Sequence, residues 1–147
     1  MKLASFQLKH YHFTRLLLEA NDGADISDSD MRDSPYRVPD ADKLKTSIVL
    51  GEPDSLEEGA EPFFLLTLGL EYQEPEFPYH FAVELDGIFV PDEQEKESDD
   101  VRHRLVVNAA SMLYSAVRDQ LLTLSARHKY GPMMLPSVDF RPITPKS

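Results

Sequence analysis

Two histidines near the amino terminus have the spacing of half a metal site. His10 and His12 are two residues apart in a stretch of strand-like alternation, so their side chains are expected to point to the same side. A zinc site takes at least three protein ligands, and none of the three remaining histidines has a spacing that ties it to this pair. We therefore interpret His10 and His12 as strand or surface histidines, and we expect neither a metal nor any other cofactor.

The residue types that support catalysis in other proteins lack the context that catalysis needs. Glu71, Glu74 and Glu76 flank a proline turn, where carboxylates are expected to be solvated. The serines between residues 111 and 125 lie in a helical pattern, without the strained G-x-S-x-G turn that presents a nucleophile. The chain has no glycine-rich phosphate loop. We therefore expect that the protein is not an enzyme.

The acidic residues are concentrated in three segments. The chain of 147 residues is 41% apolar, which fits one globular domain over residues 1–147, and it carries a net charge of -11. Residues 21–42, 51–62 and 91–100 contain 18 of the 26 acidic side chains, and the rest of the chain is mildly basic. We expect these segments to be solvated connections that repel phosphate, so nucleic acid is not an expected partner.

The sequence contains no signal that would place the protein in or across a membrane. No apolar run approaches the roughly 18 to 20 residues of a membrane span. The amino terminus, MKLASFQLKHYHF, lacks the continuous apolar core of a secretory signal. The absence of cysteine excludes disulfides and thiolate metal sites. We expect a cytoplasmic protein that does not bind membranes.

Four stretches alternate with the period of a β-strand. Residues 3–18 change the parity of their apolar positions midway, which predicts a long strand with an irregularity near His10. Residues 43–50, 63–72 and 79–89 alternate more regularly. A short proline turn joins the last two of these stretches, and this arrangement predicts an antiparallel hairpin.

Residues 21–42 form a long polar connection between the first two predicted strands. Their aspartates invite comparison with an EF-hand, but in a loop that began at Asp28 the third ligand position would be Arg32, and no glycine follows. We therefore interpret residues 21–42 as an acidic, solvated loop.

The apolar period changes to that of a helix after residue 100. Seven apolar side chains recur three and four residues apart: Val106, Ala109, Ala110, Leu113, Val117, Leu121 and Leu124. Ser98, Asp99 or Asp100 can cap its start, and Gly131-Pro132 stops it. A helix of about 24 residues would be near 36 Å long, which exceeds what a four-stranded sheet needs, so part of it is expected to contact a second copy of the chain. The order of elements predicts an α+β fold, with a four-stranded antiparallel sheet and one long carboxyl-terminal helix.

The segment KYGPMMLPSVDF, residues 129–140, is apolar although Gly131, Pro132 and Pro136 interrupt any regular structure. Flexible and aromatic side chains in this segment, the helix and the hairpin could form an apolar binding groove. The candidates are Phe77, Phe81, Met112, Tyr114, Tyr130, Met133, Met134, Leu135 and Phe140. The alternative is that the segment folds over the sheet and closes the core, and composition alone favours this alternative.

These motifs together resemble the SecB protein-export chaperones. The resemblance rests on ELDGIFVPD at the end of the last strand and on a helix and tail that contain YSAVRDQLLTLSARHKYGPMMLPSVDF. Arg118 matches a central helix arginine of the family, and Leu135 and Asp139-Phe140 match its closing motif. The resemblance covers about residues 5–140 and is strongest over 79–140.

The resemblance implies an ATP-independent holdase that binds unfolded or extended polypeptide in apolar grooves. Family members are dimers of dimers whose long helices pack together, which would explain the excess length of the helix. A second helix, usual in the family, is not expected here, because residues 141–147 form a short tail with two prolines. The family's contact with the translocase ATPase SecA would involve Glu19, Glu74 and Glu76, but the turn departs from the usual motif, which weakens the expectation of SecA binding.

A related branch of SecB-like chaperones shields antitoxins of toxin–antitoxin systems. The alternative function is therefore an oligomeric adaptor on the same fold with one dedicated partner, such as an antitoxin. The two functions differ in the number of unfolded clients that the protein would keep from aggregating.

Overall fold

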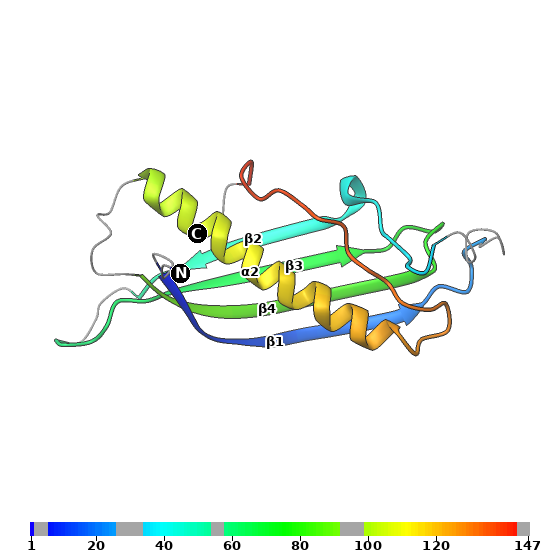
Figure 1. Cartoon of the computed structure of the whole chain (residues 1–147), viewed down its shortest axis with the longest axis horizontal. Helices are drawn as coiled ribbons and strands as arrows, with labels where there is room; N and C mark the ends of the chain where they lie inside the picture. Colours follow the sequence, from blue (N-terminus) through cyan, green and yellow to red (C-terminus); the bar gives the residue numbers. More distant parts are fainter. Residues whose placement is uncertain (2–5, 26–33, 54–57, 92–98, 144–147) are drawn as a thin grey trace.

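The computed structural model describes residues 1, 6–25, 34–53, 58–91 and 99–143, with the backbone alone for residues 99–101. Four strands form one antiparallel sheet: β1 (Phe6–Ala20), β2 (Lys45–Gly51), β3 (Phe64–Tyr72) and β4 (Tyr79–Pro91). Their order in the sheet is β1-β4-β3-β2, so β1 and β2 are the edges. A 3-10 helix, η1 (Ala41–Lys43), precedes β2, and helix α2 (Asp99–Ser125) follows β4. The predicted α+β fold is confirmed (Figure 1).

The central hairpin has the alternation that its sequence predicts. Every second residue of β3, from Phe64 to Tyr72, is buried, and the residues between them are partly exposed. The same face of β4 carries buried Tyr79, Phe81, Val83, Leu85 and Phe89. Aromatic rings stack across the two strands at both ends, with centroids 5.3 Å apart for Phe64 and Phe89 and 5.6 Å apart for Tyr72 and Phe81. One face of the sheet is therefore the core face, and the other is free of helix.

Strand β1 is irregular, as predicted, but at two places. Its register against β4 shifts between Leu8 and His10, near the predicted position, and again between Phe13 and Arg15. Each shift changes which side chains face the core, so a strict period of two cannot describe the strand. Phe6 is buried near one end, whereas Leu16 and Leu17 are exposed at about 39%.

Helix α2 lies diagonally over the core face and contacts β1, β3 and β4 (Figure 1). Its 27 residues are close to the predicted length, but it ends at Ser125, before the stop predicted at Gly131-Pro132. Six of the seven predicted apolar positions are buried, but Leu124 is exposed at 40%. Ser125 is turned inward instead, because its hydroxyl accepts a hydrogen bond from the Met133 N–H at 2.7 Å. No helix in the described ranges is long and apolar enough to cross a membrane.

The segment after α2 returns beside the helix and covers the part of the core face toward β2 (Figure 1). Met133, Leu135 and Phe140 of this segment belong to the same hydrophobic cluster as the sheet and the helix. The core is therefore closed by two unlike elements, a regular helix over one half of the sheet and an irregular segment over the other. Residues 144–147 of the predicted tail lie outside the described residues.

Candidate functional site

Residues 126–136, which we call the crossover segment, are held firmly against the sheet and the end of α2. The Tyr79 hydroxyl accepts a hydrogen bond from the Tyr130 N–H at 2.9 Å and donates one to the Gly131 carbonyl at 2.7 Å. Gly131 has φ +81°, a conformation that side chains with a Cβ rarely adopt. Together with the Met133–Ser125 bond, these contacts fix the path of the chain out of the helix.

The ends of the predicted acidic loop also fasten the crossover segment. Arg37 forms a parallel bridge with Met133, in which the Arg37 N–H donates to the Pro132 carbonyl (2.8 Å) and the Met134 N–H donates to the Arg37 carbonyl (2.9 Å). The prediction of a purely solvated loop is therefore wrong for this end of it. The backbone of residues 34–38 satisfies polar groups of the crossover segment that the sheet cannot reach. Residues 26–33 of the loop lie outside the described residues.

Asp22 holds the start of the crossover segment from the other end of this loop. Its carboxylate accepts hydrogen bonds from the Lys129 ammonium at 2.8 Å and from the Tyr130 hydroxyl at 2.7 Å. The bonds from Lys129 and then from Tyr130 hold the pKa of Asp22 below its usual range. All three groups are at the surface, where such pairs contribute little to stability. The main effect of these bonds is therefore to position the start of the crossover segment.

Most of the side chains predicted to line a groove are buried in the core. These are Phe77, Phe81, Tyr114, Met133, Leu135 and Phe140. Met134 and Tyr130 are partly exposed, and Met112 is exposed at 39% on the outer side of α2. The hypothesis that these nine side chains line an open groove is therefore wrong for the six that are buried. Its apolar residues are needed to cover the half of the sheet that one helix leaves bare, as the core-closing alternative predicts.

A crevice of about 510 Å³ lies between the start of β2, the middle of α2 and residues 137–143. Its lining residues are Ala41, Leu44, Thr46, Tyr114, Ser137, Val138, Asp139, Phe140 and Ile143. Six of the nine lining residues are apolar or aromatic, and of these Leu44, Val138 and Ile143 are only partly buried. The structure thus places an accessible, partly apolar hollow directly beside the irregular segment.

Only Tyr114 and Phe140 among the nine predicted groove residues line this crevice. Sequence reasoning missed Leu44, Val138 and Ile143. Leu44 was visible as the first apolar residue of the strand-like alternation in residues 43–50, and Val138 as an apolar residue of the irregular segment. No periodic pattern joins positions so distant in the chain, because their proximity arises from the packing of the segment over β2.

Tyr114 joins the helix to the wall of the crevice. Its hydroxyl donates a hydrogen bond to the Pro136 carbonyl, and its ring lies 5.5 Å from that of Phe140 at an angle of 70°. Burial raises the pKa of Tyr114 to about 12, and the smaller opposing effect comes from Arg118. The hydroxyl therefore remains a neutral donor at physiological pH.

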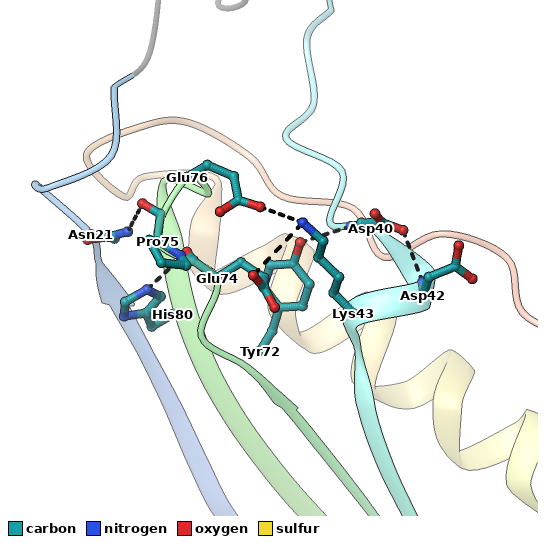
Figure 2. A network of polar contacts seen from close by, with 9 residues as sticks. All are labelled: Asn21, Asp40, Asp42, Lys43, Tyr72, Glu74, Pro75, Glu76 and His80. Atoms are coloured by element: carbon teal, nitrogen blue, oxygen red, sulfur yellow. Dashed lines mark hydrogen bonds and ion pairs between the residues drawn. The ribbon is translucent and has the colours of Figure 1, made fainter.

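The carboxylates predicted for partner contacts lie in the β3–β4 turn or close to it in the sheet. Figure 2 shows Glu74 and Glu76 of the β3–β4 turn with Lys43 of η1, whose ammonium is 2.8 Å from Glu76 Oε1 and 4.0 Å from Glu74 Oε2. The hydrogen bond from Lys43 lowers the pKa of Glu76. Glu19 is exposed and lies opposite His80 in the register of β1 and β4. Two of the three candidates are thus engaged within the chain.

Further polar contacts tie the same turn to the rest of the fold (Figure 2). The Asn21 side-chain amide donates to the Pro75 carbonyl at 3.0 Å, and the Asp40 N–H donates to the Tyr72 hydroxyl at 3.1 Å. Asp40 also caps η1, because its carboxylate accepts from the Asp42 N–H at 3.0 Å. The turn and the entrance to β2 are therefore one connected unit.

The histidine pair lies on the helix-free face. The rings of His10 and His12 are 5.3 Å apart, and His12 Nε2 is 3.7 Å from the Asp86 carboxylate. Asp86 also accepts a hydrogen bond from the Thr67 hydroxyl at 2.6 Å. In the described part of the chain, no group of three or more histidine, aspartate or glutamate side chains could hold a metal ion.

Comparison with known proteins gives matches in structure and none in sequence. No protein-family profile matches the chain, and no curated protein is similar to it in sequence. A protein of unknown function from Streptococcus agalactiae superposes with a TM-score of 0.60 at 8% identity, covering 90% of this chain and 97% of that one. The SecB-like chaperone of Mycobacterium tuberculosis, in complex with a ChAD peptide from the HigA1 antitoxin, superposes with a TM-score of 0.51 at 12% identity. That alignment covers 91% of each chain.

The chain has a SecB-like fold. Because the identities are 8% and 12%, the likeness concerns the fold and does not assign a function. The SecB-like fold nevertheless explains the order of elements, since both matches extend over about nine-tenths of this chain. It also agrees with the resemblance found in the sequence around Gly87-Ile88-Phe89 and Asp139-Phe140.

Proposed function

We propose that the protein is a SecB-like chaperone that holds extended or unfolded polypeptide without nucleotide, cofactor or covalent chemistry. The observation that carries this proposal is the partly apolar crevice between Leu44 on the β2 side and Val138 and Ile143 on the other. Such a hollow can take apolar side chains of a guest, which would otherwise remain in water. The structural neighbour in complex with an antitoxin peptide supports binding of a peptide on this fold.

The edge of the sheet beside the crevice supports a main-chain contribution to binding. Strand β2 pairs with β3 on one side, and within the described ranges no backbone hydrogen bond joins Lys45–Gly51 to any other segment. An extended guest can pair with such an edge through bonds that do not depend on its sequence. The register of β2 is continuous over its seven residues, whereas β1 is interrupted twice, so β2 is the better template.

The proposed holdase has a direct test. It should suppress aggregation of several unrelated unfolded proteins at stoichiometric amounts. The double variant Leu44→Asp/Val138→Asp places two charges in the crevice and should weaken this effect at least about tenfold, because burying an unpaired charge is costly. The matched control is Val49→Asp, which changes an exposed apolar residue of the same strand on the helix-free face.

The second candidate is an adaptor with one dedicated partner, such as an antitoxin. The observation that favours it is that the neighbour's bound peptide comes from an antitoxin. An adaptor would fail with every unrelated client and bind one partner tightly. If the protein instead keeps several unrelated clients from aggregating, the holdase is the correct function.

The remaining expectations form part of the same proposal. We propose a single domain in the cytoplasm that associates with itself through the outer side of α2, where Met112 and Leu124 are exposed. A role in protein export would require SecA. Since Lys43 engages Glu74 and Glu76, we propose no SecA contact through that turn, and Glu19 is left as the exposed candidate.

A further inference from the structure

The two halves of the carboxyl-terminal segment are fastened very differently. The crossover segment, residues 126–136, has hydrogen bonds to Tyr79, Ser125 and Arg37. Residues 137–143, which we call the strap, bond only within themselves as far as the described residues extend. These bonds join Arg141 to Asp139 and the Ile143 N–H to the Phe140 carbonyl.

Side-chain packing, rather than the backbone, holds the strap in place. Phe140 is buried against Tyr114, and Val138 and Ile143 are partly buried against the core. The hydrogen bond from Tyr114 to the Pro136 carbonyl is the last polar contact before the strap begins. Beyond that point a displacement would cost apolar contacts without breaking a ladder of backbone bonds.

Among the described walls of the crevice, the strap alone is held in place by side-chain packing without hydrogen bonds to the rest of the fold. The opposite wall is formed by Leu44, which caps the end of η1, and by Thr46 of β2, and the floor at Tyr114 belongs to α2. These elements are fixed by hydrogen bonds to the sheet or within a helix. An extended guest that is broader than the closed crevice can therefore enter only by displacing residues 137–143.

We propose that the strap swings about the Pro136–Ser137 linkage to admit a client, and that its closed position competes with the client for the apolar surface. This inference rests on the proposed function and assigns a regulatory element to the same site. The competition lowers the apparent affinity by the fraction of molecules in which the strap is open. A variant held closed should therefore bind an extended peptide more weakly than one that is free to open.

The first test measures opening without any client. Maleimide labelling of the intact free protein should be at least about 100-fold faster for Phe140→Cys than for Met133→Cys, because both side chains are buried in the closed form and local opening exposes only the strap. Equal labelling rates of the two variants would overturn the inference. This result does not depend on what the protein binds.

The second test locks the strap. The chain has no cysteine, so Thr46→Cys and Ser137→Cys introduce two unique thiols that line the crevice from opposite walls. A short bis-maleimide bridges them, and the control is the same variant capped on both thiols with N-ethylmaleimide. A fluorescent peptide of alternating leucine and serine is the probe, and circular dichroism verifies the fold of both forms.

The bridged protein should bind the probe at least about tenfold more weakly than the capped protein. Equal affinity of the two forms would overturn the competition between strap and client while leaving the proposed function intact. If the capped and the unmodified proteins both fail to bind the probe, the proposed function is wrong. The proposed competition between the strap and a client is then wrong as well. Thiol labelling then still decides whether the strap opens.

Discussion

Met133 and Met134 are adjacent in the chain and have opposite surroundings. Met133 is completely buried in the core cluster, whereas Met134 is partly exposed and contributes its N–H to the bridge with Arg37. The alternation arises because the crossover segment is extended there, so successive side chains point to opposite sides. Their shared chemistry therefore says little about their roles.

The two methionines provide a matched comparison of stability. Met133→Ala should lower the free energy of unfolding by about 2–5 kcal/mol, because it leaves a cavity in a packed core. Met134→Ala should cost less than about 1 kcal/mol. Urea denaturation of both variants checks this difference, and similar losses would contradict the assignment of Met133 to the core.

Tyr79 anchors the crossover segment through its hydroxyl. Tyr79→Phe removes the acceptor of the Tyr130 N–H and the donor to the Gly131 carbonyl while keeping the buried ring. Leaving these groups unpaired should cost about 1–3 kcal/mol. Tyr11→Phe is the control, since Tyr11 is exposed at 44% and should be neutral. Thermal denaturation of the two variants measures the difference.

Asp139 gives a prediction that depends on pH. Hydrogen bonds from the Arg141 guanidinium and N–H lower the pKa of Asp139 from 3.8 to about 2. Because the folded pKa is depressed, the contribution of this pair is present above pH 3.8 and is lost as the pH falls toward 2. Both groups are exposed, so the effect on stability is small. Carboxyl NMR titration should show a midpoint near 2, and Arg141→Gln should raise it toward 3.8.

At the scale of elements, the close approach of α2 to β4 depends on Gly87. A Cβ at this position would lie 2.8 Å from Leu113 Cδ2 and 2.9 Å from Phe89 Cε2. This contact gives a physical reason for glycine in the Gly-Ile-Phe motif, because a larger residue would push the helix away from the core face. The glycine of the motif that indicated the resemblance in the sequence thus allows α2 to pack closely on β4.

Alanine at two glycines of the central hairpin should have different effects. Gly87→Ala should destabilise the protein by about 1–3 kcal/mol, because the fully buried side chains of Leu113 and Phe89 must shift. In Gly69→Ala the obstructing atom is the Ser47 hydroxyl at 2.5 Å, on the exposed helix-free side, where it can rotate away. Chemical denaturation should therefore show a smaller loss for Gly69→Ala, and the opposite order would contradict the packing of α2.

At the scale of the whole molecule, both the helix α2 and the edge strand β1 carry apolar side chains that the chain leaves exposed. Met112 and Leu124 are exposed on α2, and Tyr11, Leu16 and Leu17 are exposed on the edge strand β1. Isolated exposed apolar residues are common, but these lie on regular elements that could pair with another copy of the chain. They support the proposed self-association, in which the outer side of the long helix contacts another copy.

The proposed self-association through α2 can be tested by measuring the molar mass of the protein in solution. Met112→Glu/Leu124→Glu should convert the oligomer into a monomer, because it places charges in an apolar contact. Val49→Glu, a change at a comparably exposed residue on the helix-free face, should leave the mass unchanged. Light scattering after gel filtration measures both. A monomeric wild type, or an unchanged mass in the double variant, would contradict assembly through α2.

Local periodicity was sufficient to predict the four strands, the helix and their order, since each depends on whether neighbouring side chains can share one buried face. It also predicted the first of the two irregularities in β1, because the apolar parity changes near His10. The accessible part of the candidate site could not be read in this way. Leu44, Val138 and Ile143 come together only because an irregular segment packs over the edge of the sheet. The folded chain alone shows that Met133 and Leu135 seal the core and that the hollow lies beside residues 137–143.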